Sequence, residues 1–156
     1  MLKKNLSTLI IFILLPIAVG MISSVLAGNI AGTYSQLNQP ELSPPAAVFP
    51  IIWTILYTLM GISSFLIFIS DSPYKEKALW IYFLQLFIIF LWSPIFFGLQ
   101  LYLLGFLWLL LLVVLIVIMI LRFYSIDPVA AYLLIPYLLW CIFAAYLSFG
   151  IYARNT

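Results

Sequence analysis

Five long apolar runs, separated by short polar turns, dominate the chain. They cover about residues 6–27, 47–70, 78–97, 101–123 and 129–152. Each run is close to the ~20 residues that an α-helix needs to cross the hydrocarbon core of a bilayer. Strands of a membrane barrel would instead show segments of about ten residues in which polar and apolar positions alternate. The pattern therefore predicts an all-α integral membrane protein, a bundle of five transmembrane helices forming a single domain over residues 1–156.

Composition supports the same conclusion. Hydrophobic residues make up 67% of the chain and charged residues only 6%, whereas a soluble domain carries about 25% charged residues. Such a chain cannot cover itself with a polar surface, so lipid must be its solvent. Backbone groups in lipid have to be satisfied within the protein, which again favours helices.

The first run has two interpretations. Lys3 and Lys4 precede it, and Val25 and Ala27 would suit the cleavage site of a signal peptide. However, the run is as long as a full span, and Pro16 lies inside it. We expect an uncleaved first span rather than a signal peptide.

Small residues recur at every fourth position of this run, at Gly20, Ser24 and Gly28. Such a row lets another helix approach closely. The partner is either a helix of the same chain, which we favour, or the same helix of a second copy. A homodimer is therefore among the expected partners.

Basic residues are distributed unequally between the two ends of the predicted bundle. One end carries Lys3, Lys4, Lys75, Lys77 and Arg122, and the other carries only Arg154. Cytoplasmic loops of membrane proteins are enriched in Lys and Arg. We therefore predict a cytoplasmic N-terminus, with the long first loop (residues 29–46) and the C-terminus outside.

Several kinds of chemistry are excluded by the residues that the sequence lacks. There is no histidine, Cys141 is the only cysteine, and no charged residue lies in the middle of a run. We therefore expect no metal site, no cofactor and no Ser-His-Asp triad, and an ion-coupled pump is disfavoured. A net charge of +2 without a basic cluster also argues against nucleic acid as a partner.

Aromatic residues are the remaining candidates for function. Trp53 and Tyr57 are four residues apart, so they lie on one face of a helix that follows a proline-rich entrance. Trp92 precedes Ser93-Pro94, and Trp140 lies four residues after Pro136 and four before Ala144. Ordinary packing would explain each tryptophan alone. Together, in a bundle without buried charge, they also fit a pocket for a large, flat, apolar ligand.

Four segments carry a resemblance to a known family, the translocator proteins or tryptophan-rich sensory proteins (TspO/MBR). PPAAVFPIIWTILYTLMG (44–61) resembles the family pattern PPxWVFGPVWTxLYxxMG. TYSQLNQPELSPP (33–45), QLFIIFLWSPIFFG (85–98) and IPYLLWCIFAAYLSFGIYARN (135–155) are similar to its first loop, third helix and fifth helix. Some family positions differ here: Leu42 and Ala47 replace tryptophans, and Ile89 and Ser148 replace asparagines.

The resemblance implies a function and a set of ligand-binding residues. Family members bind porphyrins and, in some cases, sterols or benzodiazepine- and isoquinoline-type molecules, and they are often dimeric. Some bacterial members degrade protoporphyrin in light and oxygen, for which the resemblance implies a catalytic role of Trp53 and Trp140. The implied ligand-binding residues are Phe49, Ile52, Trp53, Tyr57, Trp92, Leu104, Trp108, Trp140, Ala144 and Leu147.

Three functions remain open at this point. The first is a porphyrin-binding receptor or sensor in a bacterial or archaeal-type cell membrane, with possible breakdown of the bound porphyrin. The second is a facilitated transporter of tetrapyrroles or lipids. The third is an interaction protein that uses the small-residue face of its first helix.

Overall fold

The computed structural model describes residues 2–156, with side chains from residue 5 onward. Its elements are α1 (Leu2–Ala27), α2 (Ile30–Gln36), α3 (Val48–Ile69), α4 (Lys75–Ser93), η1 (Pro94–Gly98), α5 (Tyr102–Tyr124), α6 (Pro128–Tyr132) and α7 (Ile135–Asn155). They form five segments that are long and apolar enough to cross a membrane: Asn5–Ala27, Val48–Ile69, Lys75–Gly98, Tyr102–Tyr124 and Pro128–Asn155. The five predicted spans are therefore present, close to the expected boundaries.

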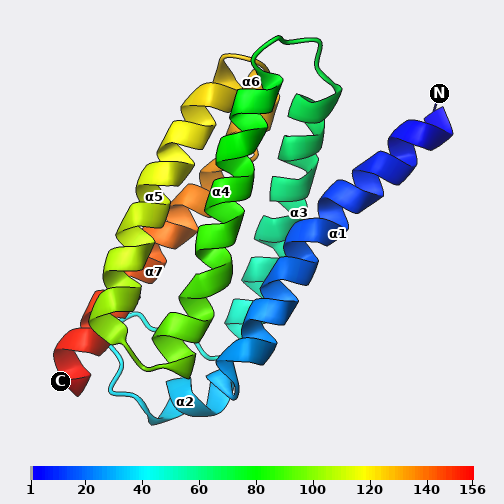
Figure 1. The fold of residues 1–156 in the computed structure, drawn as a ribbon. Helices are drawn as coiled ribbons and strands as arrows, with labels where there is room; N and C mark the ends of the chain where they lie inside the picture. The colour runs from blue at the N-terminus through cyan, green and yellow to red at the C-terminus, as the bar shows by residue number, and fades with distance from the viewer. Residues whose placement is uncertain (1) are drawn as a thin grey trace.

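Four long helices run side by side, and the first crosses them at an angle. Figure 1 shows α3, α4, α5 and α7 along one axis, while the N-terminal end of α1 leans away from them. α1 contacts α3 and α4, and α5 packs between α4 and α7. The short α2 lies across the end of the bundle where α7 finishes, opposite the end where α1 begins (Figure 1).

Close packing of α1 on α3 depends on a glycine. A Cβ atom at Gly61 would lie 2.5 Å from the Cα atom of Ile13 and 2.5 Å from the carbonyl oxygen of Phe12. The two backbones therefore touch at this point, which only a residue without a side chain permits. This contact lies beside Pro16 of α1. Pro16 has no N–H to donate to the carbonyl of Phe12, four residues earlier.

Two irregularities were not predicted from the apolar runs, and proline causes both. Pro94 cannot donate to the carbonyl of Phe90, and the chain widens there into the π-helical turn η1. The Ser23 hydroxyl of α1 donates to that free carbonyl at 2.7 Å. Pro136 likewise cannot donate to Tyr132, and the fifth span is interrupted between α6 and α7.

A buried polar chain joins three helices in the core. The Tyr137 hydroxyl donates to Gln85 Oε1 at 2.8 Å, and Gln85 Nε2 donates to the Met60 sulfur at 3.4 Å. All three side chains are at most 1% exposed. Polar groups in such surroundings need internal partners, so this chain fixes the relative register of α3, α4 and α7 behind the site described next.

Candidate ligand-binding site

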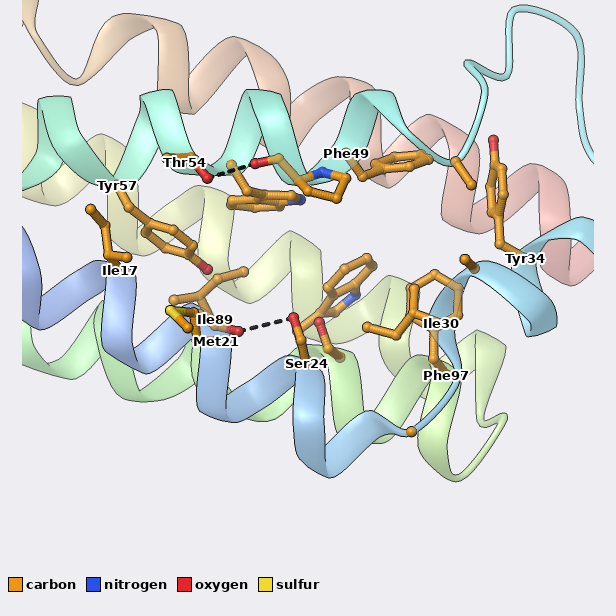
Figure 2. Close-up of a pocket in the computed structure, with 18 residues that line it drawn as sticks. Ile17, Met21, Ser24, Ile30, Tyr34, Phe49, Thr54, Tyr57, Ile89 and Phe97 are labelled. Atoms are coloured by element: carbon orange, nitrogen blue, oxygen red, sulfur yellow. Dashed lines mark hydrogen bonds between the residues drawn. The ribbon is translucent and has the colours of Figure 1, made fainter.

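A cavity of about 350 Å³ lies between α1, α2, α3 and the α4–η1 segment. This volume is at the lower end of the range for small-molecule sites. Figure 2 shows its lining residues, which come from all four walls. They are Ile17, Gly20, Met21, Ser24, Gly28, Ile30, Ala31, Tyr34, Ala46, Phe49, Pro50, Trp53, Thr54, Tyr57, Ile89, Trp92, Ser93 and Phe97.

The α3 wall is aromatic, as the sequence predicts. Trp53 and Tyr57 stack with ring centroids 5.4 Å apart and an interplanar angle of 28°. Tyr137 of α7 supports Trp53 from behind, edge to face at 6.3 Å. On the opposite side, Gly20 of α1 leaves room for the Tyr57 ring, because a Cβ atom there would collide with it.

The small-residue row of α1 faces this cavity. Gly20, Ser24 and Gly28 all line it, so their lack of bulk creates space for a ligand, in addition to the contact that Gly20 makes with Tyr57. The Ser24 hydroxyl donates to the Gly20 carbonyl at 3.0 Å, and the Thr54 hydroxyl donates to the Pro50 carbonyl at 2.7 Å (Figure 2). Both hydroxyls are thus engaged by their own helices, and the walls present a mainly apolar surface.

Trp92 lines the cavity from α4 and carries an unpaired polar group. Its ring is only 8% exposed and stacks on Phe96 at 5.3 Å. Its indole N–H is buried and has no hydrogen-bond partner among the described residues. A buried donor without a partner costs about 1–3 kcal/mol, so a ligand that places an acceptor here would recover that free energy.

The cavity opens at its side, between α1 and α3. Met21 is 66% exposed, and Ser24, Pro50 and Thr54 are also exposed although they line the cavity. All four belong to helices that form membrane spans. A ligand dissolved in the bilayer therefore has a lateral route to the aromatic wall.

The first loop closes the end of the cavity. Tyr34 of α2 is 4% exposed, packs edge to face on Phe49 at 5.1 Å, and donates from its hydroxyl to the Pro44 carbonyl at 2.7 Å. Burial raises the pKa of the Tyr34 hydroxyl above its usual value of 10, so the hydroxyl stays protonated and remains a donor at physiological pH.

The same loop is fastened to the end of α7. Asn38 N donates to Asn155 Oδ1 at 3.0 Å, and Asn155 Nδ2 donates to the Asn38 carbonyl at 2.9 Å. The Tyr146 hydroxyl donates to the Glu41 carbonyl at 2.8 Å. We call this set of contacts the loop clamp. It fixes the loop without the tryptophans that Leu42 and Ala47 replace.

The structure brings four of the ten expected ligand-binding residues to the cavity: Phe49, Trp53, Tyr57 and Trp92. Trp140 lies behind Phe49, with ring centroids 5.9 Å apart, and its buried indole N–H also has no partner among the described residues. Ile52 is partly buried against the core, next to the wall but not in its lining.

The other four expected residues lie away from the lining. Trp108 donates from its indole N–H to the Ile88 carbonyl at 2.7 Å, which joins α5 to α4. Leu104, also in α5, is 43% exposed. Ala144 and Leu147 are buried in α7, at 5% and 4% exposure.

Sequence reasoning did not identify the α1 wall or Ile89 as lining residues. The signal for the α1 wall was the small-residue row, which we interpreted as a helix-packing motif. Ile89 was noted only as a replacement for an asparagine, yet it lines the cavity next to Trp92 in sequence and in space.

Among the residues that the structure describes, no charged side chain lines the cavity. The described residues also contain no group of three or more His, Cys, Asp or Glu side chains that would hold a metal ion. The arrangement is therefore suited to binding by stacking, apolar contact and a single indole donor, rather than to acid–base chemistry.

The fold and the cavity define a class: an integral membrane protein with five helices long enough to span a bilayer, three of which, together with α2, surround an apolar cavity lined by Trp53 and Trp92. The model of the TspO/MBR family matches residues 12–154. With nine-tenths of its length matched, the chain belongs to the TspO/MBR family, as its motifs indicated.

Two individual relatives match over nearly the whole chain, and a third matches over about three quarters of it. The Tryptophan-rich protein TspO of Chlorobaculum tepidum is 35% identical, over 98% of this chain and 99% of its own length. The protein of the same name from Archaeoglobus fulgidus is 35% identical, over 97% of this chain and 99% of its own length. The Translocator protein of Homo sapiens is 34% identical, over 78% of this chain and 74% of its own length.

Proposed function

We propose that this protein is a membrane receptor or sensor that binds porphyrin-type tetrapyrroles, or similarly flat apolar molecules, in the cavity beside Trp53. The observation that carries the proposal is the combination of a charge-free cavity, a stacked Trp53–Tyr57 pair and the unpaired indole N–H of Trp92. The names of relatives, among them a tryptophan-rich sensory protein and translocator proteins, support a receptor role.

The chemistry of a tetrapyrrole matches these walls. Its flat face stacks on Trp53, a pyrrole nitrogen or carboxylate oxygen accepts from Trp92, and its polar edge points toward the first loop. Aromatic stacking contributes about 0.5–1.5 kcal/mol beyond the area buried. Since no histidine or cysteine lines the cavity, we expect a preference for the metal-free ring over haem.

Light- and oxygen-dependent breakdown of the bound porphyrin is a second part of the proposal. It would require an oxidisable side chain near the excited ring. Trp53 and Trp92 line the cavity, and Trp140 lies one ring further away, behind Phe49. Of the two tryptophans to which the resemblance gives a catalytic role, we therefore assign this chemistry to Trp53 rather than to Trp140.

Facilitated transport is the alternative function. The observation that favours it is the side opening between α1 and α3, through which a ligand would pass between the bilayer and the loop-covered end. A receptor holds its ligand, whereas a transporter exchanges it between leaflets. Transfer of protoporphyrin across vesicles that contain the protein, compared with protein-free vesicles, distinguishes the two functions.

The experiment that tests the main proposal is a titration of purified protein with protoporphyrin in detergent, in the dark and under illumination. Trp92→Phe removes the donor and should weaken binding roughly five- to tenfold, since one hydrogen bond contributes about 1 kcal/mol. Trp53→Phe should weaken binding a few-fold and slow photobreakdown. Trp108→Phe is the matched control, because its indole is engaged outside the cavity.

The outcomes separate the possible functions. If Trp53→Phe and Trp92→Phe bind protoporphyrin as well as Trp108→Phe does, the pocket assignment is wrong. Binding without loss of porphyrin under illumination supports a receptor. Breakdown that depends on Trp53 supports an enzyme.

A further inference from the structure

A second, smaller cavity lies at the end of the bundle opposite the first loop, between the first turn of α4 and the last turn of α5. Its volume is about 180 Å³, and its lining residues are Tyr74, Lys77, Ala78, Arg122, Ser125 and Ile126. We propose that it binds the phosphate group of an anionic phospholipid. This proposal is independent of the ligand of the tryptophan-lined pocket.

The two basic side chains of this cavity are available to a ligand. Lys77 and Arg122 are both exposed, and neither forms an ion pair with a carboxylate in the part of the chain that the structure describes. The nearby Asp127 accepts from Val129 N at 2.8 Å and caps α6. Lys75 is also engaged, because it donates to the Phe68 and Ser70 carbonyls.

The positive charge at the N-terminus of α4 is only partly neutralised by acidic residues of the protein. The first turn of α4 carries Lys75 and Lys77 against a single acidic residue, Glu76, and Tyr74 provides no side-chain cap. A helix N-terminus carries a partial positive charge, at which cations are unfavourable and anions are stabilised. Arg122 alone would be explained by the opposite dipole at the end of α5, but that explanation does not apply to Lys77.

Apolar residues continue from the cavity along the same faces of both helices. One and two turns further into the bundle, Ile81 and Leu84 follow Lys77 on α4, and Ile118 precedes Arg122 by one turn on α5. Leu84 and Ile118 remain 36% and 38% exposed. An acyl chain fits this surface, whereas a free phosphate ion would leave it unused.

The position of the cavity also suits a lipid. It lies where the spans Lys75–Gly98 and Tyr102–Tyr124 begin and end, respectively, which is the level of the phosphate groups in a bilayer. Trp80 is 69% exposed within one turn of Lys77, as expected for an aromatic residue at the interface. Basic pockets between membrane helices are a recognised way of holding anionic head groups.

The test is a titration of the purified protein in neutral detergent with dioleoyl phosphatidylglycerol, with bound lipid counted by native mass spectrometry. Dioleoyl phosphatidylcholine tests whether the head-group charge matters, and inorganic phosphate at millimolar concentration tests whether the free ion suffices. We expect phosphatidylglycerol to bind more tightly than phosphatidylcholine and to resist displacement by phosphate.

Variants locate the bound lipid. Lys77→Gln and Arg122→Gln should each weaken phosphatidylglycerol binding about fivefold, as expected for one basic residue near a head group. Arg154→Gln removes one exposed charge from the other end of the bundle and should leave binding unchanged. Arg122→Lys keeps the charge and should retain most of the affinity, which also controls for a folding defect in Arg122→Gln.

Three results would overturn the proposal. The first is equal binding of phosphatidylglycerol and phosphatidylcholine. The second is binding by Lys77→Gln and by Arg122→Gln that both match the Arg154→Gln control. The third is displacement of the lipid by millimolar inorganic phosphate, which would assign the cavity to a free anion.

Discussion

The five tryptophans show how one residue type serves different roles in the same bundle. Trp53 and Trp92 line the cavity, Trp108 joins two helices, Trp140 lies behind Phe49, and Trp80 is exposed. Their positions in the sequence identified all of them as aromatic residues in or near a span. The structure adds the surroundings of each ring, and these surroundings distinguish the roles.

Trp108 allows a direct test of this distinction. Trp108→Phe keeps an aromatic ring but removes the 2.7 Å hydrogen bond to the Ile88 carbonyl. We expect a loss of about 1 kcal/mol in the free energy of unfolding, measured by thermal or denaturant unfolding in detergent. Trp80→Phe, at a 69% exposed position, should change stability by less than about 0.5 kcal/mol; equal effects of the two variants would contradict the assignment.

At the scale of helices, prolines and glycines determine how the spans meet. Pro94 leaves the Phe90 carbonyl without its usual helical donor. The Ser23 hydroxyl of α1 donates to this carbonyl instead, which joins α1 to α4. Gly61 permits the backbones of α1 and α3 to touch. The cavity lies beside these contacts of α1, where the small residues Gly20, Ser24 and Gly28 leave space.

Gly61→Ala is predicted to disturb the first of these contacts. The added methyl group would lie 2.5 Å from backbone atoms of α1, which cannot move as a side chain can. Overpacking of this kind costs about 1–3 kcal/mol. Gly98→Ala is the matched control, because its Cβ atom would meet nothing closer than 3.5 Å. The midpoint of thermal unfolding in detergent should fall for Gly61→Ala only.

The sequence predicted the spans and four of the six aromatic residues that line the cavity, because hydrophobicity and helical spacing are local properties. Trp53 and Tyr57 stack because they are four residues apart on one helix. Whether Ile89 or Met21 faces the cavity depends on how α1 crosses α3 and α4, and no local pattern encodes that crossing. The short α2 was not predicted for a related reason. Its polar and small residues lack a helical apolar pattern, and they lie in a loop that is held by contacts with α7, far away in the sequence.

At the scale of the whole molecule, the two ends of the bundle differ in charge. Lys75, Lys77 and Arg122 gather at the end with the small basic cavity, and the first loop covers the other end beside Arg154. We propose, from this asymmetry, that the basic end is cytoplasmic.

Labelling of single cysteines tests this orientation. Leu42 is 81% exposed at the loop end, and Glu76 is exposed at the basic end. In intact bacterial cells, Leu42→Cys should react with a membrane-impermeant maleimide, and Glu76→Cys should react only after the cells are permeabilised. Cys141 is fully buried, so the native chain supplies the unlabelled background. Labelling of Glu76→Cys alone in intact cells would reverse the orientation.

The loop clamp ties movement near the ligand to a place that can be observed from outside the bundle. Asn155 holds Asn38, and Thr156 directly follows it. A fluorophore at Thr156 and a quencher at an exposed loop position would therefore report each opening of the loop as a rise in emission. Such an optical sensor leaves every wall of the cavity unaltered, so it would reveal whether a ligand that enters from the side also loosens the loop clamp.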